Sequence, residues 1–281
     1  MIMRLLHLLV FLAAALPPAS GGATAVPEDA HARAVVDALL DWNLPLAERR
    51  LDDWRRTSRR QAVIVLYEAI IEVARADYAP VRDTAKYDLP LVRLEAAMAA
   101  ADEVLAGSPD DFPARGAKAT AQAIAGRLLM EQGRWIRAYR HGKAARNAIR
   151  ALLRERPAFA DGYLIMGLFE YFTGTVPAVV RWLALLVDFS GDRQRGIDYL
   201  ERAVASAPVA APQAADALLL EVDFHDGEAC RYVPLARSMV GRYPRNPRYR
   251  AALRRLVRQC QRAAPDRRLP PAAFTLAAPA R

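Results

Sequence analysis

The chain has 281 residues, of which 53% are hydrophobic and 25% are charged, and its formal net charge is +9. These figures exclude a low-complexity or disordered chain, and the length allows one large folded core or two small ones. Only Lys86, Lys118 and Lys143 are lysines, and all other basic residues are arginine. This bias, with abundant alanine, is typical of a GC-rich bacterial genome, so arginine alone does not identify an anion site.

The N-terminal residues have the pattern of an export signal. Arg4 precedes a charge-free apolar run over residues 5–16, and the small residues Ala23-Thr24-Ala25 follow two prolines. This order predicts a cleaved signal peptide over residues 1–25. The run is too short to span a bilayer, and no later stretch predicts a transmembrane helix. We therefore expect a periplasmic or secreted protein that is not integral to the membrane.

Apolar residues recur at helical spacing along most of the chain. In the segment 61–76, for example, Val63, Tyr67, Ile70 and Ala74 share one face. No segment alternates with the period of a strand, so the fold class is predicted to be all-α. The predicted helices lie near residues 28–41, 45–58, 61–76, 89–106, 113–131, 134–155, 159–172, 176–187, 193–206, 211–223, 228–242 and 247–262.

Prolines follow four of these segments, at Pro109, Pro157, Pro208 and Pro244. A proline cannot continue a helix, and its recurrence at such intervals predicts stacked helix pairs. Residues 264–281 are rich in proline and alanine and are predicted to form a disordered tail. The folded domain is thus expected over residues 26–263.

Three of the predicted helices share one spacing of small or apolar residues before the proline. The three sets are Gly196, Leu200, Ala203 and Pro208; Ala145, Ile149, Leu152 and Pro157; and Ala97, Ala101, Val104 and Pro109. This spacing resembles the second helix of tetratricopeptide repeats. Tyr163, Met166 and Gly167 fit the first-helix pattern, whereas Glu170 stands where an aromatic residue is usual. The resemblance implies a right-handed superhelical array of antiparallel helix pairs, an α-solenoid.

Residues 158–208 carry a narrower resemblance. The run from Ala160 to Phe172, then Val176-Pro177 and Gly191-Asp192-Arg193, looks like a segment of bacterial tetratricopeptide proteins, and it is similar to the Iml2 and tetratricopeptide-39 family. The resemblance implies a scaffold or adaptor and supplies neither a ligand nor a catalytic motif. Residues 173–192 exceed the standard repeat and are read as an inserted apolar element at 176–187.

First helices line the concave face of such arrays, so the resemblance places a partner-binding surface on the helix near 159–172. The residues expected there are Asp161, Leu164, Leu168 and Tyr171, with Trp182 of the inserted element beside them. Tyr171 has the amphipathic ring that suits a binding hot spot. Ordinary core packing against the inserted element is the alternative interpretation of the same residues.

A basic stripe runs along the helix near 134–155. Lys143, Arg146, Arg150 and Arg154 recur at helical spacing on one face. The stripe is a candidate site for phosphate, a lipid headgroup or an acidic protein. A merely solvated helix face would have the same pattern. A second arginine cluster between Arg242 and Arg258 has the same two interpretations, and the predicted export argues against nucleic acid.

Cys230 and Cys260 are the only two cysteines. They lie about 15 residues on either side of the turn near Pro244, so they would lie at the same level of an antiparallel helix pair. An oxidising compartment then favours a disulfide over two buried thiols.

The sequence contains no motif for nucleotide binding, hydrolase catalysis or zinc-dependent catalysis. Asp223, His225, Asp226 and Glu228 are metal-like in composition, but a turn with a helix cap explains them, so no metal and no cofactor is expected. Glu170 could be a buried acid, yet an arginine partner is the commoner role of such a residue.

The expected function is therefore non-catalytic: an envelope scaffold whose concave face binds a protein or peptide. The alternative is a carrier or peripheral membrane protein for an amphiphilic or anionic ligand, and an enzyme would need a polar cluster that the sequence does not assemble.

Overall fold

The computed structural model describes residues 28–80, 83–175, 191–224 and 228–263. Within these ranges the chain is all-helical, as predicted, and contains no strand. The predicted signal peptide, the apolar element at 176–187 with Trp182, residues His225 and Asp226, and the predicted tail lie outside the described residues. The elements are α1 (Glu28–Leu40), α2 (Leu44–Thr57), α3 (Gln61–Tyr78), the 3₁₀ helix η2 (Thr84–Tyr87), α4 (Asp88–Gly107), α5 (Phe112–Glu131), α6 (Trp135–Glu155), α7 (Gly162–Gly174), α9 (Arg193–Ser206), α10 (Ala211–Leu220), α11 (Ala229–Arg242) and α12 (Pro247–Ala263).

The four prolines mark the ends of helices as predicted. Pro109, Pro157, Pro208 and Pro244 each follow shortly after the last residue of α4, α6, α9 or α11. The residue before a proline disfavours the helical conformation, so each helix stops before it. Two helix starts also have a side-chain cap with proline in the first turn: Asn43 and Asp111 accept hydrogen bonds from backbone N–H groups of α2 and α5.

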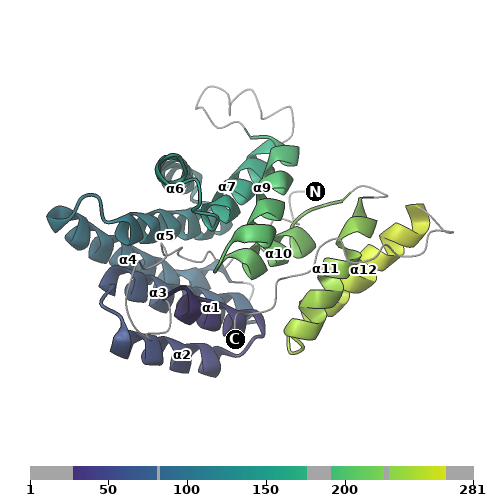
Figure 1. Cartoon of the computed structure of the whole chain (residues 1–281), viewed down its shortest axis with the longest axis horizontal. Coiled ribbons are helices and arrows are strands. Elements are labelled where there is room, and N and C mark those ends of the chain that lie inside the picture. Colours follow the sequence, from purple (N-terminus) through teal and green to yellow (C-terminus); the bar gives the residue numbers. More distant parts are fainter. Residues whose placement is uncertain (1–27, 81–82, 176–190, 225–227, 264–281) are drawn as a thin grey trace.

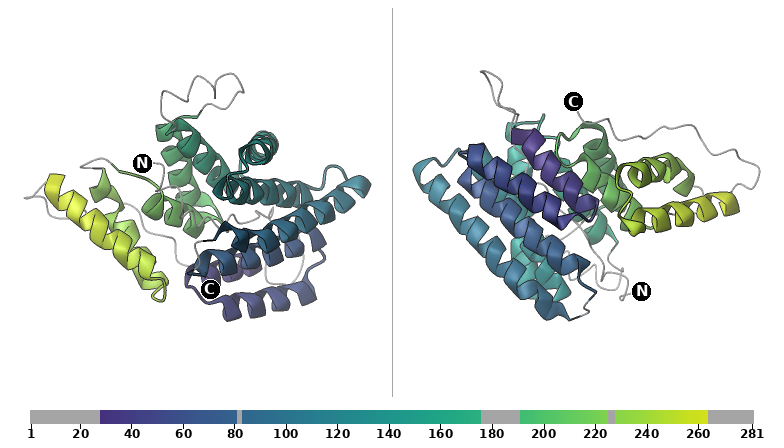
Figure 2. Two further views of the ribbon diagram at one scale, coloured as in Figure 1. Left: turned by 180° about the vertical axis from the view of Figure 1, so that it is seen from behind. Right: turned by 90° about the horizontal axis from the view of Figure 1, so that it is seen from below.

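Most of the close packing joins helices that are neighbours along the chain: α1 with α2, α3 with α4, α4 with α5, α5 with α6, α7 with α9, and α11 with α12 (Figure 1). Figure 2 shows the same neighbours from behind and from below. None of the described helices is long and apolar enough to cross a membrane.

The N-terminal helix also contacts the C-terminal part of the chain. Asp37 of α1 accepts hydrogen bonds from Arg242 and from the Tyr243 hydroxyl, at 3.1 and 2.5 Å. The buried Asn246 side chain donates to the Leu40 carbonyl at 2.9 Å. These long-range contacts connect the C-terminal hairpin, formed by α11 and α12, to α1.

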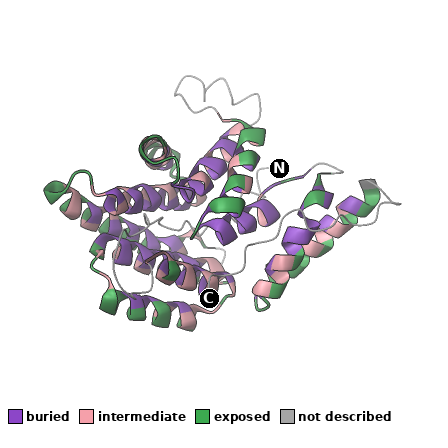
Figure 3. Cartoon of the chain, in the orientation of Figure 1, coloured by how far each residue is buried: buried purple, intermediate pink, exposed green. Residues whose placement is uncertain are grey.

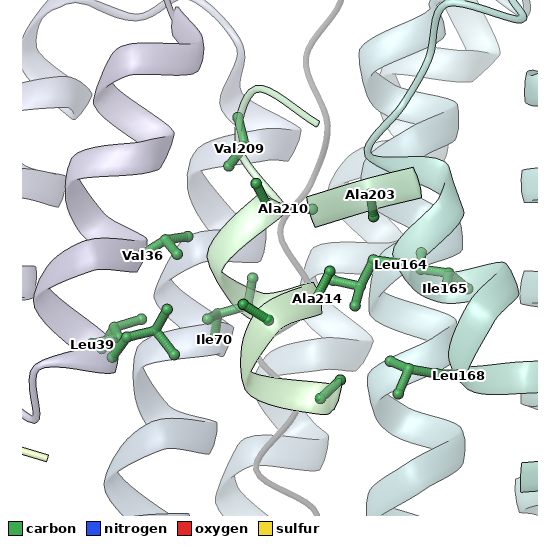
Figure 4. Close-up of a cluster of buried hydrophobic side chains, with 14 of the residues drawn as sticks. Val36, Leu39, Ile70, Leu164, Ile165, Leu168, Ala203, Val209, Ala210 and Ala214 are labelled. Carbon is green, nitrogen blue, oxygen red and sulfur yellow. The ribbon is translucent and has the colours of Figure 1, made fainter. Parts of the chain in front are cut away.

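The core centres on α10, which lies between α1 and α3 on one side and α7 and α9 on the other (Figure 4). Its alanines are small enough to let both sides approach, and every residue from Ala211 to Leu219 is buried. Figure 3 shows buried residues through the centre of the molecule, with the exposed residues of the helices on their outer faces.

Cys230 and Cys260 form a disulfide between α11 and α12, with an S–S distance of 2.00 Å. This is the pairing that their positions around Pro244 favour. Both residues are buried in the hairpin.

Candidate anion-binding groove

The residues expected on the concave face are buried instead. Leu164, Leu168 and Tyr171 of α7 are 0%, 8% and 4% exposed, and Asp161 is 3% exposed. Leu164 and Leu168 point toward α10 (Figure 4), so this helix occupies the place expected for a partner. The prediction that these four residues form a partner-binding surface is therefore wrong, and core packing, the alternative interpretation, describes them.

The polar atoms of Asp161 and Tyr171 form hydrogen bonds with backbone groups inside the fold. One carboxylate oxygen of Asp161 accepts hydrogen bonds from the backbone N–H groups of Val209 and Ala210, at 3.0 and 2.5 Å. Burial raises the pKa of Asp161 to about 7, although these two hydrogen bonds act in the opposite direction. The Tyr171 hydroxyl accepts a hydrogen bond from the Asp223 N–H at 2.9 Å. Both side chains thus hold the segments on either side of α10.

Three residues of the predicted basic stripe line a groove of about 450 Å³ between α6, α7 and α9. Arg146, Arg150 and Arg154 form its α6 wall, while Lys143 lies outside it and has its ammonium 5.7 Å from the Tyr139 ring. We call this the arginine groove; its full lining is Arg146, Arg150, Leu153, Arg154, Tyr163, Met166, Glu170, Arg195, Tyr199 and Arg202.

The three arginines of the α6 wall differ in how deeply they are buried. Arg146 is buried, and its guanidinium lies 4.8 Å from the Phe169 ring centroid, a cation–π distance. Arg150 and Arg154 are exposed, and neither has a carboxylate partner among the described residues. The outer part of this wall therefore presents two guanidinium groups to solvent.

The opposite wall consists of Arg195, Tyr199 and Arg202 of α9. The Tyr199 ring stacks on the ring of Tyr163 at 5.6 Å with an interplanar angle of 16°. Arg202 lies 4.8 Å from the Tyr163 ring and donates a hydrogen bond to the Tyr163 hydroxyl at 3.2 Å. This wall was not predicted, although an Arg-x₃-Tyr-x₂-Arg spacing on one helix face is visible in the sequence there.

Glu170 is the one carboxylate among the lining residues. Its side chain is 4% exposed and accepts hydrogen bonds from Arg195 at 2.8 Å and from the Asp192 N–H at 3.1 Å. The hydrogen bond raises the pKa of Arg195 above its usual value. Glu170 thus has the arginine partner that its sequence position favoured. It neutralises one of five guanidinium groups, so the groove remains strongly positive.

A separate cavity of about 580 Å³ lies between the C-terminal ends of α10 and α12, lined by Glu221, Asp223 and several arginines of α12. Glu221 is largely buried, and this burial raises the pKa of its carboxyl to about 8. This cavity mixes charges of both signs. In the described part of the chain, Asp223 and Glu228 belong to no group of three or more side chains that could hold a metal ion.

Comparisons of the chain with protein-family models, with curated proteins and with solved structures find no match. The geometry of the arginine groove is therefore the starting point for function.

Proposed function

We propose that this chain is a non-catalytic binding protein that holds an acidic segment of a protein partner in the arginine groove. The observation that carries the proposal is the convergence of α6 and α9, which places five guanidinium groups around one neutralising carboxylate. A cleft lined by charges of one sign raises the local concentration of oppositely charged ligands and speeds their association.

The dimensions of the groove favour an extended segment over a single small anion. Arg146 and Arg154 are about 12 Å apart along α6, and Arg195 and Arg202 are about 10 Å apart along α9. An extended chain advances about 3.3 Å per residue, so each wall matches three or four residues of a peptide. Guanidinium groups bind carboxylates through paired hydrogen bonds, which makes Asp and Glu side chains suitable ligands.

The aromatic part of the groove adds a second kind of contact. The stacked rings of Tyr163 and Tyr199 are half-buried, and Met166 lies beside them among the lining residues. An amphipathic ring offers apolar area at low entropic cost. An acidic segment that also carries apolar side chains therefore fits the groove better than one with carboxylates alone.

The cellular compartment and the arrangement of the helix pairs are also part of this proposal. We propose that residues 1–25 direct export to the periplasm or beyond, where the disulfide between Cys230 and Cys260 is stable. We also propose that the helix pairs form a tetratricopeptide-like array. The buried small residues Ala97, Ala145 and Gly196 at the helix contacts support this.

Fluorescence anisotropy with a labelled Glu/Tyr-rich peptide tests the proposed function. In R150E/R154E, both exposed guanidinium groups of the α6 wall become carboxylates. We expect this variant to bind the peptide about tenfold more weakly or worse, because attraction becomes repulsion. Affinity of the unchanged protein should also fall with added salt.

The matched control is R237E/R254E, which makes the same change of net charge at exposed arginines of α11 and α12. It should bind the peptide as the unchanged protein does. Equal loss in both variants would mean that only the overall charge matters, and no loss in R150E/R154E would reject the groove.

A further inference from the structure

A cluster of exposed apolar side chains lies away from the arginine groove, at the beginnings of α4 and α6. Five large hydrophobic side chains of the described residues are exposed, and four of them lie here. These four are Leu89 at 53%, Val92 at 59%, Trp135 at 65% and Ile136 at 72% exposed. We call them the apolar patch. Exposed tryptophan and isoleucine in adjacent positions are costly in water and mark interaction surfaces.

Polar contacts bring the beginnings of α4 and α6 together. The Gln132 side chain, in the turn before α6, donates hydrogen bonds to Asp88 at 2.8 Å and to the Thr84 carbonyl at 3.2 Å. Arg137 of α6 forms an ion pair with Glu95 of α4 at 3.2 Å. The first turns of α4 and α6 are therefore neighbours, and the four apolar side chains share one region of the surface.

Basic side chains lie within about one helical turn of the patch residues along the chain. Arg93, Arg134 and Arg140 are exposed, and none of the three has a carboxylate partner among the described residues. Three acids lie nearby. Asp88 and Glu95 already bind Gln132 and Arg137, and Glu131 lies within the electrostatic influence of Arg127 and Lys86. The border of the patch is therefore positive, in keeping with the net charge of +9.

We propose that the apolar patch docks on an anionic lipid bilayer, with Trp135 and Ile136 inserted at the interface and the surrounding arginines on the headgroups. Tryptophan is favoured at the level of the headgroups, because one side of its ring is apolar and the N–H is polar. Basic residues near the surface add attraction to anionic lipids.

The positive border favours this occupant over a second copy of the chain. A two-fold contact through the patch would bring the basic borders of both copies together. Like charges in a contact are strongly unfavourable, whereas anionic headgroups neutralise them. The patch lies about 15 Å along α6 from the nearest arginine of the groove, so docking leaves the groove a separate site.

Vesicle flotation with the full chain tests the proposal. We expect the protein to float with vesicles of phosphatidylcholine mixed with phosphatidylglycerol, and to float much less with phosphatidylcholine alone. The variant W135S/I136S should bind the mixed vesicles about tenfold more weakly, because it removes the apolar insertion. Both side chains are exposed, so the circular dichroism spectrum and melting temperature should not change.

Charge variants distinguish the effect of the basic residues near the patch from the effect of the net charge of the protein. R134E/R140E should lose flotation, while R237E/R254E, with the same net charge, should float as the unchanged protein does. The groove variant R150E/R154E should retain most of its flotation, and W135S/I136S should still bind the acidic peptide. Failure of one site is thus distinguishable from failure of the other.

Three outcomes would overturn the proposal. One is the absence of flotation with mixed vesicles. The second is equal flotation of W135S/I136S and the unchanged protein. The third is a dimer in light scattering that W135S/I136S converts to a monomer without any effect on flotation, because it would assign the patch to a second copy.

Discussion

Asp161 shows how a single buried side chain positions an element. The residue precedes α7, yet its carboxylate accepts the hydrogen bonds of the two backbone N–H groups just before α10. Those N–H groups have no acceptor within their own helix, since they belong to its start. An acidic residue at a helix start was visible in the sequence at Asp161, but which backbone N–H groups it would bind depends on how α10 packs against α7.

Substitution of Asp161 measures this contact. Asp161→Ala leaves two buried N–H groups without an acceptor and is expected to lower the free energy of unfolding by about 2–4 kcal/mol. Asp161→Asn keeps an oxygen in place and should cost less. Urea unfolding followed by circular dichroism gives both values, and equal losses for alanine and asparagine would contradict the capping role.

At the scale of elements, α7 and α9 approach closely at two glycines, Gly167 and Gly196. A Cβ atom on Gly196 would lie 2.4 Å from the Tyr171 backbone N and 2.8 Å from the Gly167 carbonyl oxygen. A Cβ atom on Gly167 would meet the Gly196 carbonyl at 3.0 Å. At Gly196 the space is filled by backbone rather than by flexible side chains, so any larger residue there must push the two helices apart.

Gly196→Ala should therefore destabilise the fold by about 3 kcal/mol. Gly142→Ala is the matched control, because Gly142 lies within α6 and a Cβ atom there would meet nothing within 4 Å. The control should stabilise the protein by about 0.5–1 kcal/mol through helix propensity. The melting temperatures of both variants test this. An unchanged melting temperature for Gly196→Ala would mean that the helices do not approach closely at this point.

The helices themselves were predictable from local patterns. Apolar spacing and the prolines gave the bounds of α4, α9 and α11 to within about two residues, the usual uncertainty of helix ends. The role of α7 was not predictable, because its apolar face reads the same whether it binds a partner or the neighbouring α10. Which face of a helix becomes buried depends on which helices pack against it, and the local sequence pattern does not determine this.

Over the whole molecule, several acids are buried in different places. Burial raises the pKa of Asp29 to about 6, that of Asp161 to about 7, that of Asp216 to about 6 and that of Glu221 to about 8. Each group therefore holds its proton more tightly in the folded chain than in the unfolded chain. The stability linked to these protons is complete below about pH 4 and is lost as the pH rises through the folded-state pKa values.

We expect the free energy of unfolding to be larger at pH 5 than at pH 8.5. Burial lowers the pKa of His141, which acts in the opposite direction near pH 6, but this is one group against five carboxyls, because burial also raises the pKa of Glu131. Glu221→Gln removes the group with the highest pKa and should flatten the slope between pH 7 and pH 8.5. Urea titrations at several pH values test this, and stability that is constant or rises with pH would contradict it.

The groove is also a property of the whole fold. The α6 wall was predictable, because Arg146, Arg150 and Arg154 lie at helical spacing. Its counterpart on α9 lies far along the chain, and only the packing of α6 and α9 against α7 brings the walls together. An isolated basic stripe on one helix is usually solvated, whereas two facing basic walls form a binding site. That the two walls face each other could be seen only in the structure.

Photo-cross-linking shows directly whether an acidic peptide binds in the arginine groove. A Glu/Tyr-rich peptide with a benzophenone group at its centre is bound, irradiated and mapped by mass spectrometry. We expect cross-links within residues 146–154 of α6 and 195–202 of α9. Cross-links confined to other surfaces, such as α12 or the apolar patch, would contradict it.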